Sequence, residues 1–292
     1  YKRQLRIGAD RRAATRGHRE WGSGGSRGES AVFRRRQRRA SRENETAMTR
    51  LAIPLLLALA GCEGAALVHE WPQFRGADGQ GHSEAVDLPL RWSETENVVW
   101  KVPVPGQGWS SPVISGQQIW MTTASTDGLS LRAVCFDRTS GKLLHDVEVF
   151  KPVKAERKHG ENGYASPTPI IDGDRVFVHF GAQGTACLDR EGQVIWRTTD
   201  YPYATWHGGG GSPVVHGDLL IYSCDGSDRQ FLVALDKASG DEVWKKDRLH
   251  LEEARRKDAL EDPGRRGLAF IAFSTPLVIR TKASDQLVSV GA

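Results

Sequence analysis

The cysteines and histidines are the residues that could most directly support chemistry, but their spacing forms neither a metal site nor a nucleophilic centre. The four cysteines include no adjacent pair and no CxxC pair, and the nine histidines show no ligand spacing with them. The sequence also presents no defensible Ser-His-Asp constellation. Cys135 and Cys187 occupy equivalent positions of a repeat whose third copy has Ala234, so we expect small, buried apolar side chains there.

Three stretches rich in glycine and aspartate could suggest ligand loops, but turns explain them better. GADGQG, at 76–81, neither follows a strand nor opens a helix, as a dinucleotide-binding loop must. DGD, at 172–174, and DGSD, at 225–228, do not supply the six or more oxygen ligands that calcium requires. All three are therefore predicted to be turns.

The elements that would position any site come from a repeat of short strands. Each unit begins with a hydroxyl residue and a proline, followed by a short apolar run and, in the first three units, a glycine turn. These pairs are Ser111-Pro112, Ser166-Pro167, Ser212-Pro213 and Thr275-Pro276. Alternating strands are expected next, at 118–124, 175–181 and 219–225. Proline spacings of 55, 46 and 63 residues, with four strands per unit, predict the blades of a β-propeller.

A turn with a fixed pattern closes each unit. Asp236 opens one copy because its carboxylate can accept backbone N–H groups, and Gly240 supplies a positive φ. Trp244 is large enough to fill the gap between neighbouring sheets. The other copies are Asp189, Gly192 and Trp196, and Asp137 and Gly141 with His145 at the tryptophan position. We expect these residues to hold blades together and not to be catalytic.

The pattern AxDxxSGxxxW, at 234–244, resembles the tryptophan-docking motif of pyrroloquinoline-quinone-type β-propeller repeats. Such repeats occur in eight-bladed quinoprotein dehydrogenases and in a non-enzymatic bacterial lipoprotein that assists outer-membrane protein assembly. WPQFRGADGQGHS, at 71–83, and the stretch that follows resemble the start of secreted quinoprotein-like propellers of planctomycete-type bacteria. The resemblance covers about residues 71–292 and implies an all-β propeller of four-stranded blades.

Residues 71–292 provide about four blades of an expected seven or eight. The fourth unit stops at LVSVGA, at 287–292, before its aspartate turn, and 98–101 is expected to be an outer strand with no blade before it. We therefore interpret the propeller as truncated at its C-terminal end and the sequence as a fragment of a longer reading frame. A stretch at 250–262 is expected to form a short, solvated helix inserted between the third and fourth units.

The basic character of the sequence is confined to its start. Residues 1–47 hold 14 basic and five acidic residues, a net charge of +9, whereas the remainder holds 26 basic and 31 acidic residues, a net charge of −5. The segment is rich in Arg, Gly and Ser and is predicted to be disordered. We interpret it as over-extended translation ahead of a true start at Met48, so no nucleic-acid partner is expected.

Residues 48–61 have the pattern of a lipoprotein-type signal peptide, in which one arginine precedes about ten apolar residues. The apolar run is too short to span a bilayer. Leu59-Ala60-Gly61-Cys62 resembles a bacterial lipobox, so Cys62 is the predicted site of lipid attachment and 62–70 a linker. An ordinary cleaved signal is the alternative. The predicted location is the periplasm or the outer face of a membrane.

A candidate site lies in the loops that enter the innermost strands. Counting three residues back from each repeat proline gives Trp109, Tyr164, Gly210 and Phe273. Aromatic side chains there could line the rim of a central channel, with His159, Asn162 and His207 adding polar contacts. Alternatively, the aromatic side chains plug the channel or pack between blades.

Two functions follow from the resemblance. The favoured one is a non-enzymatic binding or assembly scaffold at the cell envelope, anchored by lipid, with an envelope protein or ligand as partner and no cofactor. The alternative is an alcohol or sugar dehydrogenase that depends on pyrroloquinoline quinone. It would need the quinone, a calcium ion, an aspartate base and, in many such enzymes, an adjacent cysteine pair, which this sequence lacks. Whether the chain is an enzyme stays open, with the balance toward no.

Overall fold

The computed structural model describes residues 3–6, 70–86, 88–248 and 271–291. The chain divides into two units. The first comprises Tyr1–Gly8 with Ala66–Ala292, and the second comprises Ala9–Ala65, all of which lies outside the described residues. The predicted signal peptide, Cys62 and the predicted helix at 250–262 also lie outside them.

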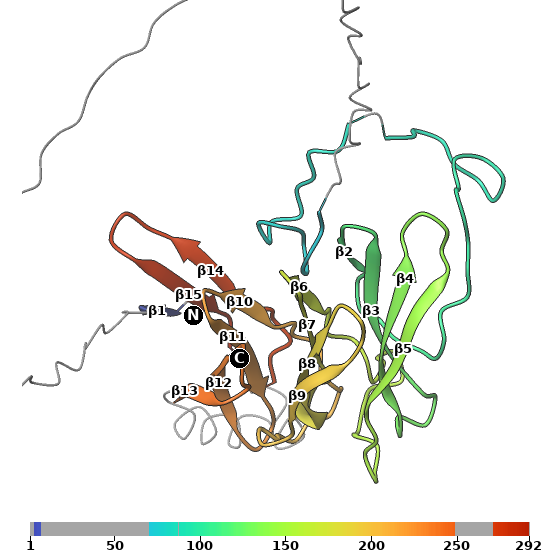
Figure 1. The fold of residues 1–292 in the computed structure, drawn as a ribbon. Coiled ribbons are helices and arrows are strands. Elements are labelled where there is room, and N and C mark those ends of the chain that lie inside the picture. The colour runs from blue at the N-terminus through green and yellow to red at the C-terminus, as the bar shows by residue number, and fades with distance from the viewer. Residues whose placement is uncertain (1–2, 7–69, 87, 249–270, 292) are drawn as a thin grey trace, which may run out of the picture. The chain divides into compact units, whose positions relative to one another are not determined.

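Four antiparallel sheets make up the described part of the first unit (Figure 1). Each of the first three has four strands in sequence order, and we call these sheets blades 1 to 3. Blade 1 contains β2 (Val113–Ser115), β3 (Gln118–Ala124), β4 (Leu131–Asp137) and β5 (Leu143–Phe150). Blade 2 contains β6 (Ile170–Asp172), β7 (Arg175–His179), β8 (Thr185–Asp189) and β9 (Val194–Thr198). Blade 3 contains β10 (Val214–His216), β11 (Leu219–Asp225), β12 (Gln230–Asp236) and β13 (Glu242–Asp247). Together with the fourth sheet, these blades confirm the predicted all-β propeller architecture.

Blade 4 has a different composition. Its strands are β14 (Leu277–Arg280), β15 (Asp285–Ser289) and β1 (Arg3–Arg6), in the order β1-β15-β14. The backbone of β1 pairs antiparallel with β15, from Arg3 opposite Ser289 to Arg6 opposite Gln286. Residues 3–6, within the segment expected to be disordered, therefore form a strand here.

The first strands of consecutive blades are neighbours, since β2 lies against β6, β6 against β10, and β10 against β14. The hydrophobic core forms where blades pack face to face. Trp120 and Phe180 belong to the cluster shared by blades 1 and 2, and Leu287 joins residues of β11 and β12 at the interface of blades 3 and 4. Cys135, Cys187 and Ala234 are all fully buried, as the sequence predicts. Burial of these faces is the main source of the fold's stability.

The segment before blade 1 crosses the innermost strands. Trp71 forms an isolated antiparallel bridge with Ile114 of β2, and the N–H of Ile171 in β6 donates to the carbonyl of Pro72 at 2.8 Å. The predicted turn at 76–81 is confirmed, because Gly79 N–H donates to the carbonyl of Gly76 and both glycines have positive φ.

Candidate functional site

The loops before β2, β6, β10 and β14 surround an open pocket of about 560 Å³, which we call the rim pocket. Two repeat positions supply most of its wall. The position three residues before the proline that directly precedes β2, β6, β10 or β14 contributes Trp109, Ser166, Gly210 and Phe273. The position directly before the proline contributes Ser111, Thr168 and Ser212. The remaining lining residues are Phe74, His159, Glu161, Asn162 and His207.

The alignment of the second unit on Pro167 is wrong by two residues. Strand β6 begins directly after Pro169, just as β2 begins directly after Pro112. The second rim residue is therefore Ser166 in place of Tyr164. Tyr164 is half-buried and does not line the rim pocket; its ring instead lies so close to Gly128 that a Cβ there would be 2.7 Å from it.

Hydrogen bonds between successive blades fix the wall of the rim pocket. The backbone N–H of Ser111 donates to Thr168 Oγ1 at 3.0 Å, and the N–H of Thr168 donates to Ser212 Oγ at 2.9 Å. The N–H of Ser212 donates in turn to Thr275 Oγ1 at 3.0 Å. We call this series the hydroxyl ladder. It explains the hydroxyl residue before the proline in blades 2 to 4, because that side chain accepts the N–H of the blade before it.

The aromatic side chains of the rim pocket present exposed rings. Trp109 is 67% exposed and Phe273 is 45% exposed. The ring of His207 meets that of Phe273 edge to face at 5.9 Å, and the ring of His159 lies 5.7 Å from that of His207. Such a row of ring faces can bind planar or apolar groups.

Asn162 joins two of the loops that form the rim pocket. Its Oδ1 accepts from Ser166 Oγ at 2.5 Å, and its Nδ2 donates to the carbonyl of His207 at 2.6 Å. The side chain is half-buried, so these bonds set the separation of the loops. His207 Nδ1 is buried and has no hydrogen-bond partner among the described residues.

The rim pocket does not fit a calcium-bound quinone. Among the described residues that line it, the one carboxylate is Glu161, which is 94% exposed and lies 3.8 Å from His159 Nδ1. The amide oxygen of Asn162 is already an acceptor for Ser166 and for the N–H of Gly163. Within the described ranges, no group of three or more His, Cys, Asp or Glu could hold a metal ion. Calcium takes six to eight oxygen ligands, and this lining does not supply them.

A buried carboxyl lies next to the loops of the rim pocket. Thr205 donates its hydroxyl to Glu156 Oε1 at 2.8 Å, and burial raises the pKa of Glu156 to about 7. No sequence pattern indicates this residue, because its burial depends on packing against Thr205, 49 positions away along the chain.

The turn residues join neighbouring blades. The indole N–H of Trp196 in blade 2 donates to the carbonyl of Lys237 in blade 3 at 3.1 Å, and its ring covers Gly240. A Cβ at Gly240 would lie 2.7 Å from that ring, and its φ is +82°. Trp100 makes the same contacts with blade 1, where it donates to the carbonyl of Arg138 at 2.9 Å and covers Gly141.

The remaining turn residues follow this arrangement with variations. His145 takes the docking position opposite Gly192 and stacks on Trp120 at 5.7 Å. Trp244 is half-buried against the core shared by blades 3 and 4.

Hydrogen bonds from the turn to its aspartate lower two carboxyl pKa values. The Ser140 hydroxyl, with its N–H, lowers the pKa of Asp137, and the N–H of Ser239 lowers that of Asp236. Asp189 accepts from the N–H of Gln193 at 2.7 Å.

No helix in the described ranges is long and apolar enough to cross a membrane.

Three solved structures illustrate the similarity of this chain to known proteins. BamB from Moraxella catarrhalis is 20% identical, with 49% of this chain and 37% of that chain covered and a TM-score of 0.33. A quinohemoprotein alcohol dehydrogenase, ADHIIG, from Pseudomonas putida HK5 is 17% identical, with 61% and 26% covered and a TM-score of 0.41. A quinohemoprotein alcohol dehydrogenase from Comamonas testosteroni is 14% identical, with 60% and 28% covered and a TM-score of 0.41. The chain thus spans less than two fifths of each of these proteins.

No curated protein sequence matches the chain significantly. A family model does match it, over residues 91–266, which is more than half of the sequence, and that model describes outer membrane protein assembly factor BamB. The matched range contains all three aspartate turns and the docked tryptophans Trp100 and Trp196. The chain belongs to the family of outer membrane protein assembly factor BamB, with its quinoprotein-like propeller repeats.

Proposed function

We propose that this chain is a non-enzymatic binding or assembly scaffold at the cell envelope, exported and held at a membrane surface through an acylated Cys62. Family membership supports the proposal, because the family is described as an assembly factor for outer membrane proteins. A single acyl chain attached ahead of the propeller would keep the blades next to the membrane. The partner would be an envelope protein or a ligand carried there.

The observation that carries the proposal is the composition of the rim pocket. Exposed rings of Trp109 and Phe273 line it, and its one carboxylate, Glu161, is directed to solvent. A surface of this kind suits recognition of apolar or aromatic groups on a partner. Quinone-dependent alcohol or sugar oxidation is the competing function, and it would require calcium ligands that this lining does not provide.

A titration with pyrroloquinoline quinone, with and without calcium, separates the two functions. We expect the absorbance spectrum of the quinone to stay unchanged on addition of the chain in either condition. The variants are Trp109→Ala, in the rim pocket, and Trp92→Ala, whose side chain is 71% exposed outside it. A saturable, calcium-dependent change that Trp109→Ala weakens and Trp92→Ala leaves intact would contradict the scaffold proposal.

The same two positions give the scaffold a positive test. A photo-crosslinking residue at position 109 is expected to form a discrete adduct in envelope preparations, and one at position 92 is not. Equal labelling from both positions, or none from either, would count against partner binding at the rim pocket.

A further inference from the structure

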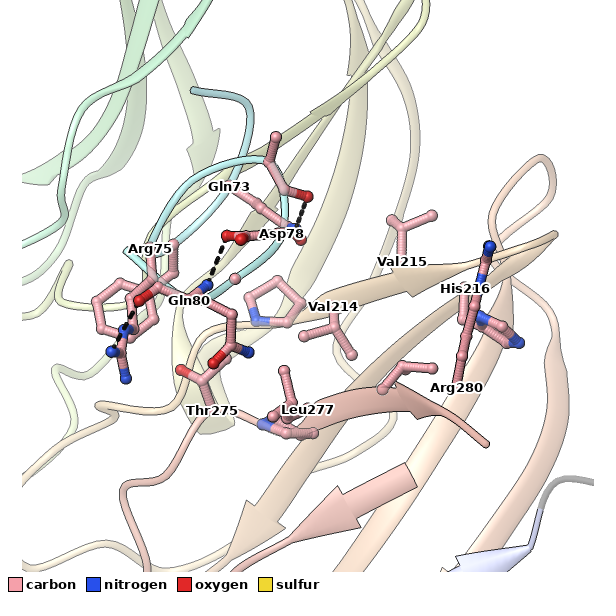
Figure 2. Close-up of a pocket in the computed structure, with 16 residues that line it drawn as sticks. Gln73, Arg75, Asp78, Gln80, Val214, Val215, His216, Thr275, Leu277 and Arg280 are labelled. Carbon is pink, nitrogen blue, oxygen red and sulfur yellow. Dashed lines mark hydrogen bonds between the residues drawn. The ribbon is translucent and has the colours of Figure 1, made fainter. Parts of the chain in front are cut away.

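A second cavity, of about 490 Å³, lies between the segment 73–80 and the innermost strands β10 and β14. We call it the inner-edge groove. In Figure 2, Gln73, Asp78 and Gln80 frame it from the segment, while Val214, Val215 and Leu277 come from the strands. It is separate from the rim pocket, with which it shares Phe74.

The chain itself demonstrates how the innermost strands can be paired. Trp71 exchanges two backbone hydrogen bonds with Ile114 of β2, at 2.9 Å and 2.8 Å, and the next residue, Pro72, accepts from Ile171 of β6. Ile114 and Ile171 are equivalent, since each lies two residues after its repeat proline. The backbone at this position therefore faces away from its own sheet and toward an added strand.

The same position in blades 3 and 4 is occupied by Val215 and Val278, and both line the inner-edge groove. Outside the strand ladders of blades 3 and 4, no backbone hydrogen bond involves either residue in the described part of the chain. Two edges that are paired in blades 1 and 2 are thus open in blades 3 and 4. Such edges bind extended peptides through main-chain hydrogen bonds.

The charges around the groove favour an anionic group at one end. In Figure 2, Arg280 and His216 lie at the end of the groove away from Arg75 and Gln80. Arg75 already donates to the carbonyl of Gln80 at 3.1 Å, and Asp78 accepts from the N–H of Gln80 at 2.8 Å.

His216 Nε2 lies 3.3 Å from the carboxylate oxygen Oδ2 of Asp285. Arg280 is exposed and its side chain has no hydrogen bond or ion pair among the described residues, so its guanidinium is available for a carboxylate.

We propose that the inner-edge groove binds a short extended peptide that adds backbone hydrogen bonds to Val215 and Val278 and places its terminal carboxylate on Arg280. Apolar side chains of the peptide would contact Val214 and Leu277, which line the groove on β10 and β14. This inference goes beyond the proposed function. Peptide binding here would stand even if the rim pocket bound a quinone, because Phe74 is the one lining residue that the two cavities share.

The test is fluorescence anisotropy with the full chain and three labelled forms of the peptide Gly-Val-Thr-Val. The first has a free C-terminal carboxylate, the second a C-terminal amide, and the third an N-methylated backbone with a free carboxylate. We expect the first to bind in a saturable manner and the other two to bind about tenfold more weakly. Loss of a charged contact explains the second result, and loss of backbone donors explains the third.

Protein variants locate the binding. Arg280→Gln is expected to reduce affinity for the free carboxylate peptide about tenfold, to the level of the amide, and Arg280→Lys to retain part of it. Arg91→Gln is the matched control, because Arg91 is exposed and does not line the groove. Circular dichroism and thermal melts establish that each variant is folded.

Any of four results would overturn the proposal. One is equal binding of the N-methylated peptide. Another is equal loss of affinity in Arg280→Gln and Arg91→Gln. The third is a photo-crosslinked peptide that maps by mass spectrometry to a site other than β10, β14 or residues 73–80. The fourth is failure of all three peptides to bind. That result is expected if a second copy or another segment of the chain fills the groove.

Discussion

At the scale of single residues, His179 is a polar side chain that must stay uncharged. It is 1% exposed, its Nδ1 lies 2.8 Å from Thr185 Oγ1, and the ring of Tyr222 lies 4.5 Å away. Burial lowers the pKa of His179 to about 3. Blade 2 therefore contains a histidine that serves packing and a single hydrogen bond between adjacent strands, with no role in either pocket.

The depressed pKa makes folding depend on pH. The unfolded chain binds a proton at His179 below about pH 6.5, and the folded chain does so only near pH 3. The contribution of His179 to the free energy of unfolding is therefore complete above pH 6.5. Below that pH, the free energy of unfolding falls by up to ~1.4 kcal/mol for each pH unit. Urea unfolding at pH 7.5, 6.0 and 5.0 should show this slope in the parent chain and a shallower one in His179→Gln. Parallel pH profiles for the two proteins would contradict the assignment.

At the scale of elements, the docked tryptophans connect one blade to the next. Trp196 combines an inter-blade hydrogen bond to Lys237 with a ring packed on Gly240, a position that only glycine can occupy without strain. Blade 1 uses His145 in place of a tryptophan. At the interface of blades 1 and 2, the carbonyl of Arg190 is equivalent to that of Lys237. It accepts a hydrogen bond from the side-chain amide of Gln118 at 2.9 Å. The interface between two blades can thus keep a hydrogen bond to the turn carbonyl although a histidine replaces the tryptophan.

Truncation of a docked tryptophan should loosen the blades. Trp196→Ala removes the ring and the N–H donor together, and we expect a loss of about 2–4 kcal/mol in the free energy of unfolding. Trp92→Ala, at an exposed tryptophan, should change it by less than about 0.5 kcal/mol. Chemical denaturation measures both. Equal losses in the two variants would show that docking does not stabilise the interface.

Much of the element structure could be predicted from the sequence because local patterns determine it. The strands expected at 118–124 and 219–225 have the limits of β3 and β11. The strand expected at 175–181 instead ends at His179, because Gly181 has a φ of +59° and begins a 3-10 turn. Alternating apolar residues do not indicate where a buried strand gives way to such a turn.

The candidate site was harder to predict, because it depends on register. The stretch SPTP, at 166–169, offers two hydroxyl-proline pairs, and only Pro169 keeps the four-residue interval to the following glycine turn found at Pro112 and Pro213. That interval was the available signal for Ser166. The contribution of Phe74 had no local signal, because the segment that carries it reaches the pocket by crossing strands of other blades.

At the scale of the whole molecule, the hydroxyl ladder links all four blades near their innermost strands. Two of its acceptors, Thr168 and Ser212, are buried, so loss of either would leave a backbone N–H without a partner. Blade packing alone would permit sliding between sheets. The ladder instead fixes the height at which each loop enters the rim pocket.

Removal of one acceptor should affect two blades at once. Thr168→Val keeps the side-chain volume but leaves the N–H of Ser111 unpaired, which should reduce stability by about 1–3 kcal/mol. Hydrogen exchange should show faster exchange at Ser111. Thr139→Val, at an exposed threonine whose hydroxyl donates to the side chain of Gln117, is the control and should leave exchange at Ser111 unchanged. Equal protection at Ser111 in both variants would show that the ladder has no structural role.

The distribution of buried cysteines gives the molecule a set of internal reporters. Cys135 lies in β4, Cys187 in β8 and Cys224 in β11, so blades 1, 2 and 3 each contain one free thiol. Burial raises the pKa of Cys135 and Cys187 to about 12 and that of Cys224 still further above its usual range. An alkylating reagent can therefore modify each thiol only while its own blade is open. Brief alkylation followed by peptide mass mapping would time the opening of three blades independently in one sample.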